Sequence, residues 1–151
     1  MNIVGAIVAG VVGTAVFSMV AGMAPRMGMP KMAIWEMLGS MFSKDGNNTL
    51  GWVLHFMMGA IFAIIYAALW SAGVGSVSVG SGALFGAVHW LAAGLVMGGM
   101  PMLHEGIKAG TVQAPGVYML SSGGMLAFMG GLIGHVVYGA VVALVYGLFI
   151  G

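Results

Sequence analysis

Residues 51–66 read GWVLHFMMGAIFAIIY, and residues 131–146 read GLIGHVVYGAVVALVY. Six positions match without a gap, in the pattern G-x3-H-x3-G-A-x2-A-x2-Y. Histidine and tyrosine occur only four times each, so the matches at these two residue types are the strongest evidence for a repeat. At about 100° per residue, the histidine, the second glycine and the tyrosine fall within roughly 40° of one another on a helix. Each copy is therefore predicted to place these three residues on one narrow helix face. We interpret the chain as two copies of one unit.

The composition predicts an integral membrane protein. The chain is 61% hydrophobic and 5% charged, with a mean hydropathy of +1.10, which is too apolar for a soluble domain of 151 residues. Backbone amides in lipid must be satisfied within the spanning segment, so long apolar stretches are expected to be helices. Four stretches are long enough to cross a hydrocarbon core about 30 Å thick, namely 3–24, 51–70, 79–100 and 124–150. We therefore expect an all-α membrane protein with four transmembrane helices in a single domain, residues 1–151.

The charged residues predict the orientation of the chain. All seven lie in two of the three connections between spans: Arg26, Lys31, Glu36, Lys44, Asp45, Glu105 and Lys108. The positive-inside rule places loops 25–50 and 102–121 in the cytoplasm and both termini outside, in a prokaryotic inner membrane. The net charge of +1 and the lack of a basic patch indicate no nucleic-acid partner. The absence of cysteine excludes disulfides and thiolate metal sites.

Each half of the chain consists of a span, a long polar loop and a second span. The halves, about 1–72 and 79–151, are therefore two tandem helical hairpins, predicted to be parallel repeats about an axis along the membrane normal. The first and third spans correspond more loosely: Gly10, Gly22 and Pro25 match Gly86, Gly98 and Pro101 at an offset of 76. Residues 30–42, which follow the first span, are expected to form a short interfacial helix.

Small residues predict how the helices pack. Glycine is the commonest residue, at 28, and small side chains let helix backbones approach closely in lipid. The second and fourth spans carry equivalent small-xxx-small ladders, formed by Gly51, Gly59 and Ala63 and by Gly131, Gly139 and Ala143. These ladders predict that the second and fourth spans form the close-packed central pair.

Three short motifs carry a resemblance to known proteins. They are GWVLHF at 51–56, MPM at 100–102 and HVVYGA at 135–140. With these motifs the chain resembles a family of small, functionally uncharacterised prokaryotic membrane proteins with four spans. The resemblance covers most of the chain, implies the four-span fold and supplies no activity.

His55 and His135 are the first candidate site. At matched depth on symmetry-related helices, two imidazoles could ligate one b-type haem from both faces, with Gly59 and Gly139 making room for the macrocycle. The alternative, which we favour, is that each histidine bonds a neighbouring carbonyl, tyrosine or serine and fixes helix register. His89 is expected to be a hydrogen-bonded packing residue. Tyr66 and Tyr146 are expected in an interfacial aromatic belt.

Methionine supplies the second candidate site. The chain has 16 methionines, and Met100, Met102 and His104 could place three soft ligands around one Cu(I) ion. The alternative is that methionine is a flexible filler of apolar packing, which we favour.

The sequence favours a non-catalytic accessory or structural subunit of a larger membrane complex, or a homo-oligomer, with no cofactor. A haem or Cu(I) protein is the alternative, and a small channel or carrier is the third hypothesis. The reasons are the glycine-lined spans, the lack of a Ser/His/Asp set or paired carboxylates, and the absence of acidic residues within the spans. The partners expected are the lipid bilayer and other membrane subunits or further copies of the chain.

Overall fold

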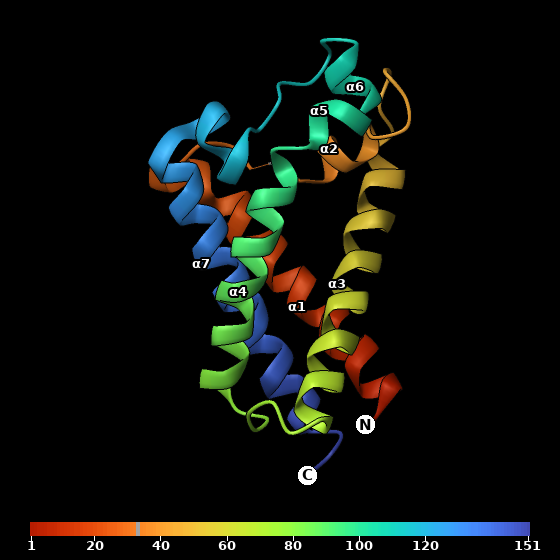
Figure 1. Ribbon diagram of the computed structural model, residues 1–151, viewed down its shortest axis with the longest axis vertical. Coiled ribbons are helices and arrows are strands. Elements are labelled where there is room, and N and C mark those ends of the chain that lie inside the picture. Colours follow the sequence, from red (N-terminus) through yellow and green to blue (C-terminus); the bar gives the residue numbers. More distant parts are fainter. Residues whose placement is uncertain (33) are drawn as a thin grey trace.

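A computed structural model of the protein describes residues 1–32 and 34–151, and within them every element is helical (Figure 1). Four helices are long and apolar enough to cross a membrane, so the predicted fold class is confirmed. They are α1 (Ile3–Met23), α3 (Asn48–Ser71), α4 (Val79–Met97) and α7 (Leu120–Gly147). The shorter elements are η1 (Ala24–Met27), α2 (Ile34–Gly39), α5 (Met100–Leu103), α6 (Glu105–Lys108) and η2 (Val117–Met119).

Polar residues outside the apolar runs set where three of the spans begin. Asn2, Asn47 and Ser78 precede α1, α3 and α4, and each side chain accepts a hydrogen bond from the backbone N–H three residues later. These bonds satisfy amides that would otherwise lack a partner in the first helical turn. The fourth span differs, because α7 contains a break at Gly124, where φ is +59°.

The interfacial helix is shorter than predicted. Residues 30–42 were expected to be helical, but α2 covers only Ile34–Gly39, and Ala33 lies outside the described residues. The helix lies so close to α3 that a Cβ on Gly51 would overlap the backbone carbonyl of Trp35. Trp35 also stacks on Trp52 of α3, with ring centroids 4.4 Å apart. Close packing on α3 thus holds this one turn of helix in place.

The predicted central pair is wrong. α1 and α7 pack along each other in the middle, α3 lies against α1, and α4 lies against α7, whereas α3 and α7 barely meet (Figure 1). The reason lies on α1, which carries glycines of its own on two faces. Gly10 faces the backbone at Gly59 and Ala60 of α3, whereas Gly13 faces Tyr138 and Val142 of α7. α1 therefore takes the central place that the ladders suggested for α3.

The two hairpins pack in the same way. A Cβ on Gly10 would lie 2.6 Å from the carbonyl oxygen of Gly59, and a Cβ on Gly82 would overlap the carbonyl oxygen of Gly139. Gly82 rather than Gly86 is thus the counterpart of Gly10, so the offset between α1 and α4 is 72, one helical turn less than predicted. Pro25 and Pro101 keep the predicted offset, since each lies near the start of a short helix after its span.

Only one of the two seams between the hairpins is closed. On the α1–α7 seam, Phe17 packs into the gap left by Gly134. At the positions equivalent to Gly13 and Gly134, the α3–α4 seam carries the bulky Phe85 and Leu54. Small residues allow close helix approach in lipid, and large ones prevent it. The second seam consequently stays open over part of its length.

α3 and α4 meet through side chains from the turn that joins them as far as the stacked rings of Phe62 and His89. Trp70 donates a hydrogen bond from Nε1 to Ser81 Oγ at 2.7 Å and stacks on Phe85. Toward the other end of the molecule the two helices separate (Figure 1). At the same end as this turn the two termini lie together, where the backbone N–H of Asn2 donates to Tyr146 Oη at 3.1 Å.

The glycine contacts predict a position-specific effect on stability. Gly82→Ala would force α4 away from α7, because the added Cβ overlaps backbone, and should destabilise the protein by about 1–3 kcal/mol. Gly80→Ala on the same helix is the control, since a Cβ there has open space around it. Unfolding in mixed micelles of increasing denaturing-detergent content measures both. Equal stability of the two variants would contradict the packing described here.

Candidate functional site: an apolar cavity between α3 and α4

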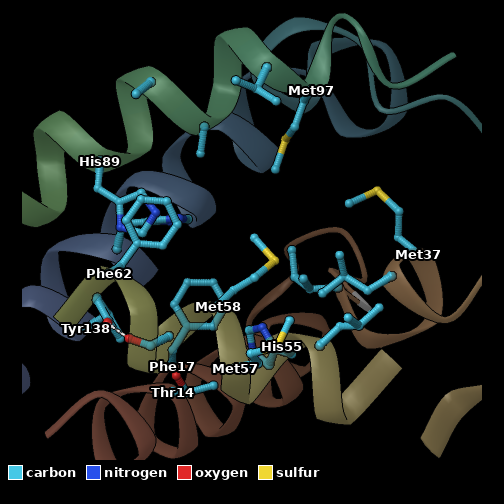
Figure 2. A pocket seen from close by; sticks show the side chains of 18 of the residues that line it. Thr14, Phe17, Met37, His55, Met57, Met58, Phe62, His89, Met97 and Tyr138 are labelled. Carbon is cyan, nitrogen blue, oxygen red and sulfur yellow. Dashed lines mark hydrogen bonds between the residues drawn. The ribbon is translucent and has the colours of Figure 1, made fainter. Parts of the chain in front are cut away.

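The open seam encloses a cavity of about 410 Å³. α3 and α4 form its sides, α1 and α7 form its rear wall, and α2 and α5 lie at its loop end (Figure 2). Among the described residues that line it there is no charged side chain. The lining includes six methionines and three histidines, which are Met37, Met41, Met57, Met58, Met97, Met100, His55, His89 and His135. A cavity of this size is within the range of small-molecule sites.

The rear wall is joined to α3 by one hydrogen bond between helices and by one close contact. The Tyr138 hydroxyl donates across to the backbone carbonyl of Gly59, which links α7 to α3. Thr14 of α1 donates from Oγ1 to Gly10 O at 2.8 Å and fills the space over Gly59, where a Cβ would overlap it. Gly59 therefore makes two contacts, of which the one with Thr14 leaves no room for a larger residue.

His55 is tied to α1. Its Nε2 lies 3.1 Å from Ser18 Oγ, and the Ser18 hydroxyl donates to Thr14 O at 2.8 Å. A serine has one proton to donate, so Ser18 accepts from His55, and the proton of a neutral His55 lies on Nε2. Nδ1 is then a free acceptor.

His135 is tied to its own helix. Its Nδ1 lies 2.8 Å from the carbonyl oxygen of Gly131, and a carbonyl can only accept. The proton of a neutral His135 therefore lies on Nδ1, and Nε2 is a free acceptor. The two histidines that match in the sequence thus use different nitrogens and different partners.

His89 on α4 is the third histidine of the cavity. Its ring stacks on Phe62, with centroids 3.7 Å apart (Figure 2). It also meets the His135 ring edge-on, with centroids 4.8 Å apart. Its Nδ1 lies 3.2 Å from the hydroxyl of Tyr66, a side chain only 3% exposed. Because a buried phenol needs an acceptor for its proton, Tyr66 donates to Nδ1. His89 then carries its own proton on Nε2.

The candidate haem ligands are close together but separated by an aromatic ring. Phe17 contacts both imidazoles edge-on, with ring centroids 5.7 Å from His55 and 5.2 Å from His135. This phenyl group stands between the faces that a bis-histidine haem would have to bridge. The partners expected under the favoured interpretation, a serine for His55 and a carbonyl for His135, are those observed.

The candidate Cu(I) ligands are not brought together. Met100 lines the cavity, Met102 is 77% exposed and His104 is fully buried. Both nitrogens of His104 are in use, since Nε2 donates to Met37 O at 2.7 Å and Nδ1 accepts from the Ile107 backbone at 3.1 Å. His104 thus fastens the second loop to α2. Within residues 1–32 and 34–151, no three His, Asp or Glu side chains converge on a metal position.

The six predicted packing residues all lie at buried helix contacts, but their neighbours are not those expected. Gly51 meets α2, Gly59 and Ala63 meet α1, and Gly131, Gly139 and Ala143 meet α4. The predicted belt position of Tyr66 and Tyr146 is wrong, because they are only 3% and 2% exposed and point into the core.

His89 is hydrogen-bonded and packed against an aromatic ring, as expected. Its place beside His135 in the cavity was not predicted, because His89 has no histidine counterpart in the first half. Its structural counterpart at the offset of 72 is Phe17, and both rings pack on the repeated histidine of their own hairpin. Positions 17 and 89 both carry an aromatic ring, and this match between the two halves could have pointed to His89.

Comparison with models of known families, with curated proteins and with solved structures found no match to this chain.

The hydrogen bonds of His104 predict a structural role that needs no metal. His104→Ala removes bonds to α2 and to the start of α6, and should cost about 1–3 kcal/mol. We expect the same loss of thermal stability in chelator and in Cu(I)-containing buffer. A loss seen only with Cu(I) would instead make His104 a metal ligand.

Proposed function

We propose that this protein is a non-catalytic, multi-pass membrane protein that binds a lipid-soluble small molecule in the α3–α4 cavity. The observation that carries the proposal is an uncharged cavity between two spanning helices. Its lining includes six methionines, three histidines, and Thr14 and Tyr138, whose hydroxyls donate to backbone carbonyls. Methionine is flexible and polarizable, and it is common at surfaces that adapt to apolar ligands.

The access route supports the same proposal. In the described part of the chain no element crosses in front of the gap between α3 and α4 (Figure 1). A ligand dissolved in the bilayer would enter sideways through this gap, and a long apolar tail would remain in lipid. The two ion pairs, Lys31 with Glu36 and Lys108 with Glu105, have exposed side chains, and none of the four residues lines the cavity.

A photoactivatable diazirine alkane tests binding in nanodiscs. We expect cross-links to concentrate on peptides that line the cavity, especially at Met57, Met58 and Met97. Ala93→Phe on α4 should reduce this labelling several-fold because the ring fills the cavity. Leu95→Phe is the control, because Leu95 is exposed on the same helix and does not line the cavity. Labelling spread evenly over all lipid-facing residues would overturn the proposal.

A role as accessory subunit or homo-oligomer is a second proposal and is compatible with the first. It is supported by the apolar surface of all four spans, among them the exposed Val4, Ile61, Leu84 and Leu144. A partner retained in a native pull-down, or a stable oligomer in mild detergent, is the expected result. A monodisperse monomer without a partner would remove this role.

The membrane and the orientation are further parts of the proposal. We place the protein in a prokaryotic inner membrane, with loops 25–50 and 102–121 in the cytoplasm, on the positions of the charged residues.

The lack of cysteine makes this orientation directly testable with single cysteines. An impermeant maleimide should label Ser76→Cys, in the α3–α4 turn, in intact cells. It should label Ser43→Cys only after the membrane is permeabilised. The opposite pattern would reverse the assignment.

A further inference from the structure

The hydrogen-bond partners of the three histidines define what kind of polar group fits the cavity. Each histidine uses one ring nitrogen for a protein partner and leaves the other free. In the described residues, the one buried side-chain nitrogen or oxygen without a partner is Nε1 of Trp90. The free nitrogens of the three histidines are therefore reachable, and the open space that their rings line is the cavity.

The free nitrogens are of two kinds. The assigned tautomers leave a lone pair on His135 Nε2 and a proton on His89 Nε2. The two rings are neighbours, with centroids 4.8 Å apart and planes at 89°. His55 offers a second lone pair, on Nδ1, at the other side of Phe17. One acceptor and one donor thus belong to neighbouring rings that both line the apolar cavity.

We propose that the cavity selects a lipid-soluble molecule with a hydroxyl group, which donates to His135 Nε2 and accepts from His89 Nε2–H. This inference rests on the proposed ligand-binding function and names the class of ligand. A hydroxyl supplies one proton and two lone pairs, so it satisfies both histidines. A ketone, an ether or an oxidised quinone can only accept, and would leave His135 without a partner.

Two kinds of lipid-soluble molecule carry such a hydroxyl group. One is an aliphatic alcohol on a long apolar chain, and the other is a phenol or hydroquinone with an apolar tail. The stacked pair of Phe62 and His89 would accept either beside it. The binding measurements include both, so that they separate the two kinds.

The test is competition for labelling by the diazirine alkane in nanodiscs. The competitors are a prenyl alcohol and its methyl ether, and a hydroquinone with an alkyl tail and its oxidised quinone. Interhelical hydrogen bonds in membranes are worth roughly 0.6–1.7 kcal/mol, so we expect each hydroxyl compound to compete about 3- to 20-fold better than its partner. The better of the two hydroxyl compounds identifies the kind.

Variants separate recognition from partitioning into the bilayer, because partitioning is the same for every variant. Partitioning alone gives each matched pair of compounds a fixed ratio of competition. In His135→Leu the measured ratio should fall to within about twofold of that value. The double variant Tyr66→Phe/His89→Phe should behave likewise, without leaving the tyrosine hydroxyl unpaired. Phenylalanine already occupies the equivalent position 17, which favours a folded double variant. Leu95→Phe, which is exposed on α4 and does not line the cavity, is the control and should retain the preference.

Nitrogen-15 NMR of histidine in the unmodified protein gives a readout that needs no variant. We expect the lone-pair nitrogen of His135 to move to lower chemical shift when the alcohol is added, and to stay in place with the ether. Equal competition by alcohol and ether, with no such movement, would overturn this inference and leave ligand binding intact. No competition by any compound, together with labelling outside the cavity, would overturn the proposed function itself.

Discussion

Direct contact between helix backbones at glycine is the constraint on which this structure depends. In lipid the apolar side chains gain nothing by leaving the solvent, so helices are held by close packing and by hydrogen bonds made at short range. Gly59 shows both effects, because its missing side chain admits Thr14 and its carbonyl accepts from Tyr138. The equivalent crossing of Gly82 and Gly139 holds the second hairpin. These two crossings fix the spans within each hairpin, and the contact of Phe17 with Gly134 joins the hairpins.

The cavity arises because the two halves are similar without being identical. Gly13 and Gly134 let α1 and α7 close, whereas Phe85 and Leu54 hold α3 and α4 apart at the equivalent places. The same divergence places a histidine, His89, where the first half has a phenylalanine. The two similar hairpins thus form one closed seam and one open seam, and the three histidines line the cavity at the open one.

The four spans, their approximate ends and the buried ladder positions were predictable, because hydropathy and small-residue spacing report local properties of one helix. Which helix meets which was not predictable, since Gly59 and Gly139 have the same spacing but lie against different neighbours. The pairing depended on glycines of α1 that the 80-residue repeat does not include. Likewise, the importance of His89 rests on its contact with His135, which joins residues distant in the sequence.

The principal seam joins the first span of the chain to the last, and the contact of Asn2 with Tyr146 closes the same end. This arrangement has a consequence for biogenesis. While the chain is being synthesised, α1 and α3 can pair early, but the glycine face of α1 that receives α7 stays exposed to lipid until the final helix enters the membrane. Packing of these four spans is therefore completed only after α7 has been translated. A nascent protein stalled before residue 120 would present an unfilled groove to the insertion machinery and its chaperones.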